Sequence, residues 1–240
     1  MSKSLKLFLG ISYITILFIF IYLVFSLVDL TKLDDFLYYK ELQISLEKII
    51  STNLYLNLLI FFLFSIIWVS LLGFGTPLLL VSGILFGKWV GTFISVLSIS
   101  VGALTLYSIA QFFFKELIHN LFEKKFIKYF HLFKRREFNY FLLFRLCGGL
   151  GIPFGPQNIL PVIFNIKKSN YFTASFIGFF PMFFIWNSIG SGLNEYVKQA
   201  DDFSFINLLF DKEIYLPIIF FIVIMLVSIV VKKRSFGDKN

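Results

Sequence analysis

The chain has 240 residues, of which 58% are hydrophobic, only 15% are charged and 35 are phenylalanine. A soluble domain keeps about a quarter of its residues charged, so this composition excludes an ordinary soluble fold and indicates that lipid covers much of the apolar surface. The formal net charge of +8 would suggest nucleic-acid binding in a soluble protein. Here the basic residues lie in short connections beside apolar runs, which is typical of signals that orient a membrane protein.

The first predicted elements are a membrane helix and an interrupted apolar segment. We interpret residues 5–28 as an uncleaved helix because no small-x-small cleavage site follows them. A connection with mixed charge, 29–52, leads to two apolar arms, 54–72 and 77–87. The second arm would form about 17 Å of helix, far short of a ~30 Å hydrocarbon core. We therefore expect a re-entrant hairpin, followed by a spanning helix at 89–114.

The second half of the chain repeats this order of elements. A basic connection at 115–139 precedes the apolar stretch 138–166, which glycines and prolines interrupt. This stretch predicts a second re-entrant hairpin. Residues 170–193 can span, the connection 194–213 is acidic, and residues 214–231 span again before a basic tail.

The distribution of charge tests this layout. If each interrupted segment enters and leaves on one face, the 115–139 connection and both termini lie in the cytoplasm, and the 29–52 and 194–213 connections lie outside. Every connection then obeys the positive-inside rule. The two hairpin-plus-helix units have opposite orientations, as in inverted-repeat transporters. An offset of 79 residues aligns Pro77 with Pro156 and Lys88 with Lys167.

We therefore predict an all-α polytopic membrane protein, an inverted repeat with two re-entrant helical hairpins and about four full-length spanning helices. Residues 1–52 form an N-terminal membrane helix and external connection. Residues 53–193 form the core of two inverted units. Residues 194–240 contain an external connection, the last membrane helix and a basic cytoplasmic tail.

Two sequence blocks carry a resemblance to a known family. The first begins at Phe74 and reads FGTPLLLVSGILFGKWVGT, and the second begins at Phe144 and reads FRLCGGLGIPFGPQN. Over roughly residues 50–195 the chain resembles the DedA superfamily, also described as VTT-domain or SNARE-associated Golgi membrane proteins. The resemblance implies two re-entrant hairpins, a bacterial inner-membrane or eukaryotic endomembrane location, and movement of phospholipids or polyprenyl phosphates between leaflets.

The chain departs from this family in its acidic residues. Some members carry membrane-embedded carboxylates thought to couple transport to protons. Here no Asp or Glu occurs between Glu47 and Glu116, or between Glu137 and Glu195. The sequence therefore favours energy-independent equilibration of lipid over proton-driven transport.

Four polar residues are candidates for binding a lipid headgroup: Arg145, Gln157, Asn158 and Lys88. Arg145 lies ~10 Å inside the second apolar stretch if that stretch is helical, and a lipid phosphate would suit its planar guanidinium. Alternatively, Arg145 extends to the cytoplasmic surface or caps hairpin carbonyls. Gln157 and Asn158 either bind a headgroup or bridge the hairpin arms, and Lys88 either attracts a headgroup or extends to the outer interface.

A second set of residues is expected to shape the hairpins. It comprises Gly75, Pro77, Gly83, Gly87, Gly91, Pro153 and Pro156. Gly83, Gly87, Gly91 and Ser95 are spaced by four residues, with Ser98 and Gly102 beyond them, which predicts one stripe of small residues along a helix. Such a stripe lets another backbone approach closely. We interpret the single cysteine, Cys147, as a small residue packed among glycines.

The remaining expectations concern function and location. Ser191 lacks a nearby histidine base, so we expect no enzymatic activity, and no cofactor or metal. The 115–139 connection has the spacing of an amphipathic interfacial helix. We expect a multi-pass protein of the bacterial plasma (inner) membrane with cytoplasmic termini. Its partners would be membrane lipids with anionic headgroups and no nucleic acid, and a homo-oligomer is compatible with the sequence. Alternatives are a small-solute or ion transporter or channel of the same fold, and a non-transporting assembly factor.

Overall fold

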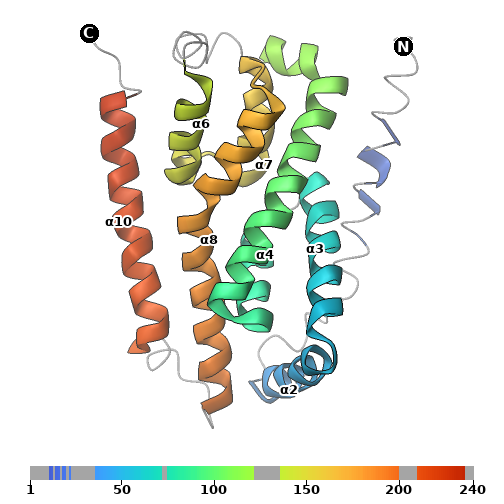
Figure 1. Cartoon of the computed structure of the whole chain (residues 1–240), viewed down its shortest axis with the longest axis vertical. Coiled ribbons are helices and arrows are strands. Elements are labelled where there is room, and N and C mark those ends of the chain that lie inside the picture. Colours follow the sequence, from blue (N-terminus) through green and yellow to red (C-terminus); the bar gives the residue numbers. More distant parts are fainter. Residues whose placement is uncertain are drawn as a thin grey trace.

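The computed structural model describes residues 36–71, 75–121, 136–199 and 210–235, and scattered positions between 11 and 22. Within these residues the chain forms helices and no strands (Figure 1). The α-helices are α2 (Phe36–Thr52), α3 (Leu54–Ser70), α4 (Gly75–Phe113), α6 (Glu137–Leu146), α7 (Phe154–Ile159), α8 (Lys168–Gln199) and α10 (Lys212–Ser235). Two 3-10 turns, η2 (Gly148–Gly151) and η3 (Leu160–Phe164), flank α7. The prediction of an all-α fold is confirmed.

Helix α4 folds back on itself at Gly87. Gly87 has φ 72° and ψ 173°, a combination that is essentially restricted to glycine. The Oγ atoms of Ser82 and Ser95 lie 2.7 Å apart, whereas 13 residues of straight helix would separate them by about 20 Å. Residues 75–86 and 88–113 are therefore two arms packed against each other. The bend lies where the second arm was predicted to end, and part of the predicted link between the two arms, residues 72–74, lies outside the described residues.

The prediction of one continuous stripe of small residues is wrong, because the bend at Gly87 puts its members on two different helical arms. A Cβ added at Gly83 would overlap the backbone carbonyl of Asn187 in α8. One added at Gly91 would lie 2.7 Å from the carbonyl oxygen of Ser82. Each glycine thus permits a close backbone approach, but the two approaches belong to separate contacts.

The second interrupted segment leaves one end of the molecule and returns to it. The Glu137 carboxylate at the start of α6 accepts hydrogen bonds from the Lys167 backbone N–H (3.2 Å) and from Asn170 Nδ2 (2.5 Å), just beyond the segment's far end. Between them the chain turns through η2, in which all four residues have positive φ. Prolines 77, 153 and 156 lie in or just before the first turns of α4 and α7, where a helix does not need their missing N–H.

The two long helices run in opposite directions, as an inverted repeat requires. Three ring contacts join them: Trp89 with Phe184 (4.8 Å between centroids), Phe93 with Phe180 (5.4 Å) and Tyr107 with Tyr171 (4.5 Å). Residue numbers rise along α4 as they fall along α8. A Cβ added at Gly75 would lie 3.5 Å from the ring of Phe154, so the start of α4 meets the start of α7. The same offset of 79 residues that aligns the prolines relates these two residues.

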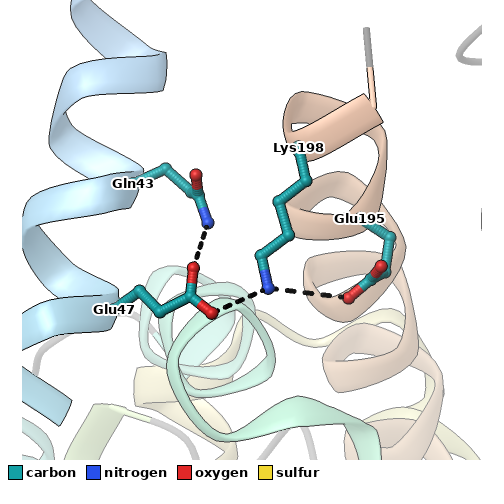
Figure 2. Close-up of polar contacts among 4 residues, drawn as sticks. All are labelled: Gln43, Glu47, Glu195 and Lys198. Atoms are coloured by element: carbon teal, nitrogen blue, oxygen red, sulfur yellow. Dashed lines mark hydrogen bonds and ion pairs between the residues drawn. The ribbon is translucent and has the colours of Figure 1, made fainter. Parts of the chain in front are cut away.

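Polar contacts show which connections share an end of the molecule. Figure 2 shows Lys198 near the end of α8 paired with Glu47 of α2 at 3.2 Å, with Gln43 and Glu195 beside them. The two connections predicted to be external therefore meet. At the other end, Gln111 donates to Asn165 Oδ1 at 2.7 Å. The relative arrangement of the connections agrees with the layout deduced from charge.

Among the described residues, two helices are long and apolar enough to cross a membrane, Gly75–Phe113 and Lys168–Gln199, or three if the bent pair 43–50 and 54–70 counts as one span. The protein is a helical membrane protein. Most of residues 5–28, and 122–135 of the predicted interfacial helix, lie outside the described residues. Helix α8 extends to Gln199, so the prediction that 194–199 belong to a connection is wrong. The 29–52 connection contains α2.

Candidate functional site

Arg145 lies in the last turn of α6 and is 1% exposed. Helix α6 approaches α8 closely here because Gly178 has no side chain, and a Cβ at Gly178 would overlap that of Arg145. The guanidinium is thereby directed into the space between α6, α7 and α8. The alternative that Arg145 extends to the cytoplasmic surface is wrong, because the side chain is buried.

The guanidinium is held by neutral side chains. Arg145 Nε donates to Ser175 Oγ at 3.2 Å, and Nη2 donates to Asn158 Oδ1 and Tyr171 Oη, both at 2.8 Å. The alternative that Arg145 caps hairpin carbonyls is therefore not what the structure shows. The guanidinium carbon also lies over the rings of Phe141 (4.8 Å), Tyr171 (5.3 Å) and Phe179 (4.6 Å). Such cation–π contacts contribute about 0.5–2 kcal/mol each, but they leave the positive charge unneutralised.

Two hydrogen-bond donors in this cluster have no partner. Among the described residues, Arg145 makes no ion pair, and the buried atoms Arg145 Nη1 and Asn158 Nδ2 make no hydrogen bond. Leaving a buried donor without an acceptor costs roughly 1–3 kcal/mol, and more for a charged group. A cationic donor and an amide donor on neighbouring side chains form the kind of site that an anionic oxygen would complete.

Gln157 has a structural position, separate from this cluster. Its Nε2 donates to the carbonyl oxygens of Gly148 (3.1 Å) and Ile152 (2.5 Å). The side chain fills the inside of the η2 turn, where a Cβ at Gly149 would overlap it. Of the two roles expected for Gln157, the structure shows the bridge between the hairpin arms.

Lys88 directly follows the bend of α4 at Gly87. The start of α10 and the bent end of α4 lie toward the opposite end of the molecule from α6 (Figure 1). The Nζ of Lys88 is 2.9 Å from Glu213 Oε2, and the two side chains are 38% and 42% exposed. The structure therefore brings Arg145 and Asn158 together, and places Gln157 in the adjacent turn. Lys88 belongs to a different part of the molecule.

The sequence analysis did not identify Tyr171 and Ser175, which hold the guanidinium. They are four residues apart on α8 and therefore share one face of that helix. This spacing of two hydroxyl side chains inside a predicted span is the sequence pattern that could have identified them. Both residues are fully buried, as partners of a buried charge must be.

A second buried polar cluster, also absent from the sequence analysis, joins α8 to the two arms of α4. Ser82 Oγ donates to Asn187 Oδ1 and lies 2.7 Å from Ser95 Oγ, and Asn187 Nδ2 donates to the carbonyl oxygen of Phe183 at 2.8 Å. All of these groups are neutral. Nowhere in the described residues do three His, Cys, Asp or Glu side chains come together as a metal ion would need.

Comparison with known proteins identifies a family to which this chain is similar. A family model described as the VTT domain matches residues 57–192. The match covers more than half of the chain and includes all of α4, most of α3 and α8, and the whole Arg145 cluster. No solved structure matches the chain.

Proposed function

Since the chain belongs to the VTT-domain family of the DedA superfamily, we propose that it equilibrates a phosphate-bearing lipid between the two leaflets of a membrane. One observation supports this most directly. Arg145 is a buried cation that has only neutral partners, and it lies beside a second buried donor without an acceptor. A structural protein would have little reason to keep such a group inside a bilayer, where charges are expensive and usually functional.

A lipid phosphate matches what this cluster lacks. Guanidinium binds phosphate through parallel N–H donors in one plane, and hydrogen bonds between ionised groups are about twice as strong as neutral ones. Tyr171, Ser175 and Asn158 Oδ1 fix the orientation of Arg145. Nη1 and Asn158 Nδ2 remain for the ligand. Binding would offset both the buried charge and the desolvation of the headgroup, which is the main barrier to its crossing.

The hairpins support the same proposal. We place both interrupted segments as re-entrant hairpins whose tips, at Gly75 and Phe154, meet inside the bilayer. Non-helical backbone at that depth is tolerated where protein or water covers it. The basic connections would face the cytoplasm, with both termini, in a bacterial plasma membrane. Because the sequence has no carboxylate within either hairpin, equilibration would need no proton gradient.

Reconstitution in phosphatidylcholine vesicles tests the proposal. Exchange of a fluorescent phospholipid or polyprenyl phosphate is followed with an impermeant quencher, and uptake of free phosphate is measured in the same vesicles. We expect exchange of at least one lipid. Arg145→Ala should slow it by roughly 10- to 100-fold, since hydrogen bonds to charged groups contribute about 1.5–3 kcal/mol. Arg145→Lys should retain part of the activity.

Arg136→Ala is the matched control, because it removes the same charge from an exposed position at the start of α6. It should exchange lipid at the rate of the unaltered protein. Full exchange by a well-folded Arg145→Ala variant would contradict the proposal. Phosphate uptake without any lipid exchange would instead identify a solute transporter of this fold.

A further inference from the structure

Two cavities lie where α10 faces α8. The larger, of about 560 Å³, is close to the bend at Gly87, and the smaller, of about 270 Å³, reaches Cys147 and the η2 turn. Ile224 of α10 lines both. They are therefore adjoining parts of one depression, which we call the α8–α10 groove. The larger cavity alone is within the ~300–1,000 Å³ range of sites that hold small molecules.

The groove has a local cause in the sequence. Pro181 of α8 and Pro217 of α10 both line the larger cavity. A proline inside a helix removes a backbone hydrogen bond and bends the helix. Two such helices cannot pack closely along their whole length, so space remains between them.

One end of the groove is cationic. Lys88 and Lys212 line it together with a single carboxylate, that of Glu213, which is paired with Lys88 at 2.9 Å. One positive charge is therefore in excess. The buried hydroxyl of Ser188, 3% exposed, also lines the cavity and has no hydrogen-bond partner among the described residues. Two cations and an unpaired hydroxyl suit the phosphate and ester oxygens of a lipid headgroup.

The rest of the groove is apolar and has the length of one leaflet. Phe184, Leu216 and Phe220 line it beyond the charged end. From Lys212 to Ile224 helix α10 rises by about 18 Å, a little over half of a ~30 Å hydrocarbon core. The polar end would thus lie at one interface and the apolar end near the middle of the bilayer.

We infer that the α8–α10 groove binds one phospholipid with an anionic headgroup, whose phosphate lies between Lys88 and Lys212 and whose acyl chain lies against α8 and α10. The lipid belongs to the leaflet at the α2 end of the molecule. The smaller cavity continues the groove to Cys147, two residues beyond Arg145. As a loading site for exchange, the groove deepens the proposed function and rests on it. As a binding site it can be tested separately.

The single cysteine supplies a reporter that does not depend on transport. The delipidated full-length protein in detergent is titrated with phosphatidylglycerol or with phosphatidylcholine, and the reaction of Cys147 with N-ethylmaleimide is timed. Native mass spectrometry counts the lipids retained. We expect phosphatidylglycerol to protect Cys147 and to bind roughly tenfold more tightly than phosphatidylcholine, since each lysine near an anionic headgroup contributes about 1 kcal/mol.

Paired variants locate the lipid. Lys88→Gln with Lys212→Gln should abolish the preference for phosphatidylglycerol, whereas Lys198→Gln, which removes a cation at the same end but outside the groove, should keep it. Ile224→Trp should fill the groove and abolish protection. Val223→Trp, on an exposed neighbouring position, should not. A retained preference for phosphatidylglycerol in the double lysine variant, or equal protection of Cys147 by both lipids in the unaltered protein, would overturn the inference.

Leaflet exchange then separates the two proposals. Ile224→Trp should slow exchange at least about fivefold while Val223→Trp leaves it unchanged, in keeping with the loss of a bound headgroup. Exchange that depends on Arg145 but not on Ile224 would overturn the loading role and leave the proposed function intact. Protection of Cys147 in a protein that exchanges no lipid would overturn the proposed function and the loading role, but support the lipid site.

Discussion

The two halves of this molecule share one architecture and differ in the chemistry at their centres. In the first unit, residues 54–113, a neutral cluster of Ser82, Ser95 and Asn187 joins the bent α4 to α8. In the second unit, residues 137–199, the space between α6, α7 and α8 holds Arg145, which has only neutral partners among the described residues. The first cluster consists of matched donors and acceptors. The second cluster has a net positive charge and two hydrogen-bond donors without an acceptor.

The repeat makes this difference informative. The offset of 79 residues places Ile66 of α3 at the position of Arg145 of α6. The surroundings differ as well: a Cβ added at Gly102 would meet the backbone of Ile66 and the Cβ of Val69, whereas one added at Gly178 would meet the Cβ of Arg145. The equivalent position of the first unit therefore carries a hydrocarbon side chain. The fold does not require a cation there, so the cation must be explained by what it binds.

The largest predicted effect tests how the first unit is held together. Gly83→Ala would place a methyl group on the backbone carbonyl of Asn187, which cannot move without shifting α8. Overpacking of this kind costs roughly 3 kcal/mol, so the melting temperature in detergent should fall sharply. Gly75→Ala is the control, since its Cβ would make only an ordinary contact with Phe154 at 3.5 Å. Equal melting temperatures for both variants would show that the α4–α8 contact is not tight.

The next prediction sets the two clusters against each other. Asn187→Ala should cost about 1–3 kcal/mol of stability through lost buried hydrogen bonds, with lipid exchange retained. Arg145→Met should abolish exchange and leave stability equal or higher, because replacing buried charge by apolar groups is often neutral or stabilising. Thermal unfolding and leaflet exchange, measured on the same samples of both variants, test these two expectations. A strongly destabilised Arg145→Met variant would mean that the cation is structural.

A finer comparison uses two stacked tyrosines. Tyr171→Phe removes a hydroxyl that accepts from Arg145 Nη2 at 2.8 Å, so it should slow exchange severalfold by releasing the guanidinium. Tyr107→Phe removes only a 2.6 Å hydrogen bond to the Ile166 carbonyl and should cost about 1 kcal/mol of stability. Exchange rates and melting temperatures should therefore distinguish the Tyr171→Phe variant from the Tyr107→Phe variant. Identical behaviour would show that Tyr171 does not orient Arg145.

The smallest expected effect concerns the surface. Lys198→Ala breaks the ion pair with Glu47 that links α8 to α2 (Figure 2). Exposed pairs contribute about 0–1 kcal/mol and are screened by salt, so the change in melting temperature should be barely measurable and should vanish at high salt. A large loss that persists in salt would assign α2 a greater structural role than its contacts suggest.

Features that depend on local sequence were predictable. The break at Gly87 followed from an apolar arm too short to span, and its backbone conformation is one that glycine alone adopts readily. The position of Arg145 inside the second interrupted segment followed from the length of the apolar run before it. The all-helical class and the relative sides of the connections followed from apolar length and charge.

Features that depend on how helices face one another were not predictable from the same information. Tyr171, Ser175 and Asn187 all lie on α8, and only the packing shows that the first two face α6 and the third faces α4. The small-residue stripe was misjudged because a spacing of four implies one face only while the helix continues. The ion pair of Lys88 with Glu213 joins residues 125 positions apart, a separation that no local pattern encodes.

The ring of Phe154 lies next to Gly75, since a Cβ added at Gly75 would be 3.5 Å from it. The start of α4 and the start of α7 are therefore neighbours, and displacement of one would change the packing of the other. A rearrangement at one of these helix starts would therefore press on the other through this aromatic ring, in addition to the contacts between α4 and α8. The two interrupted segments are thus coupled. A substitution at position 154 should alter how they move relative to each other as well as how they pack.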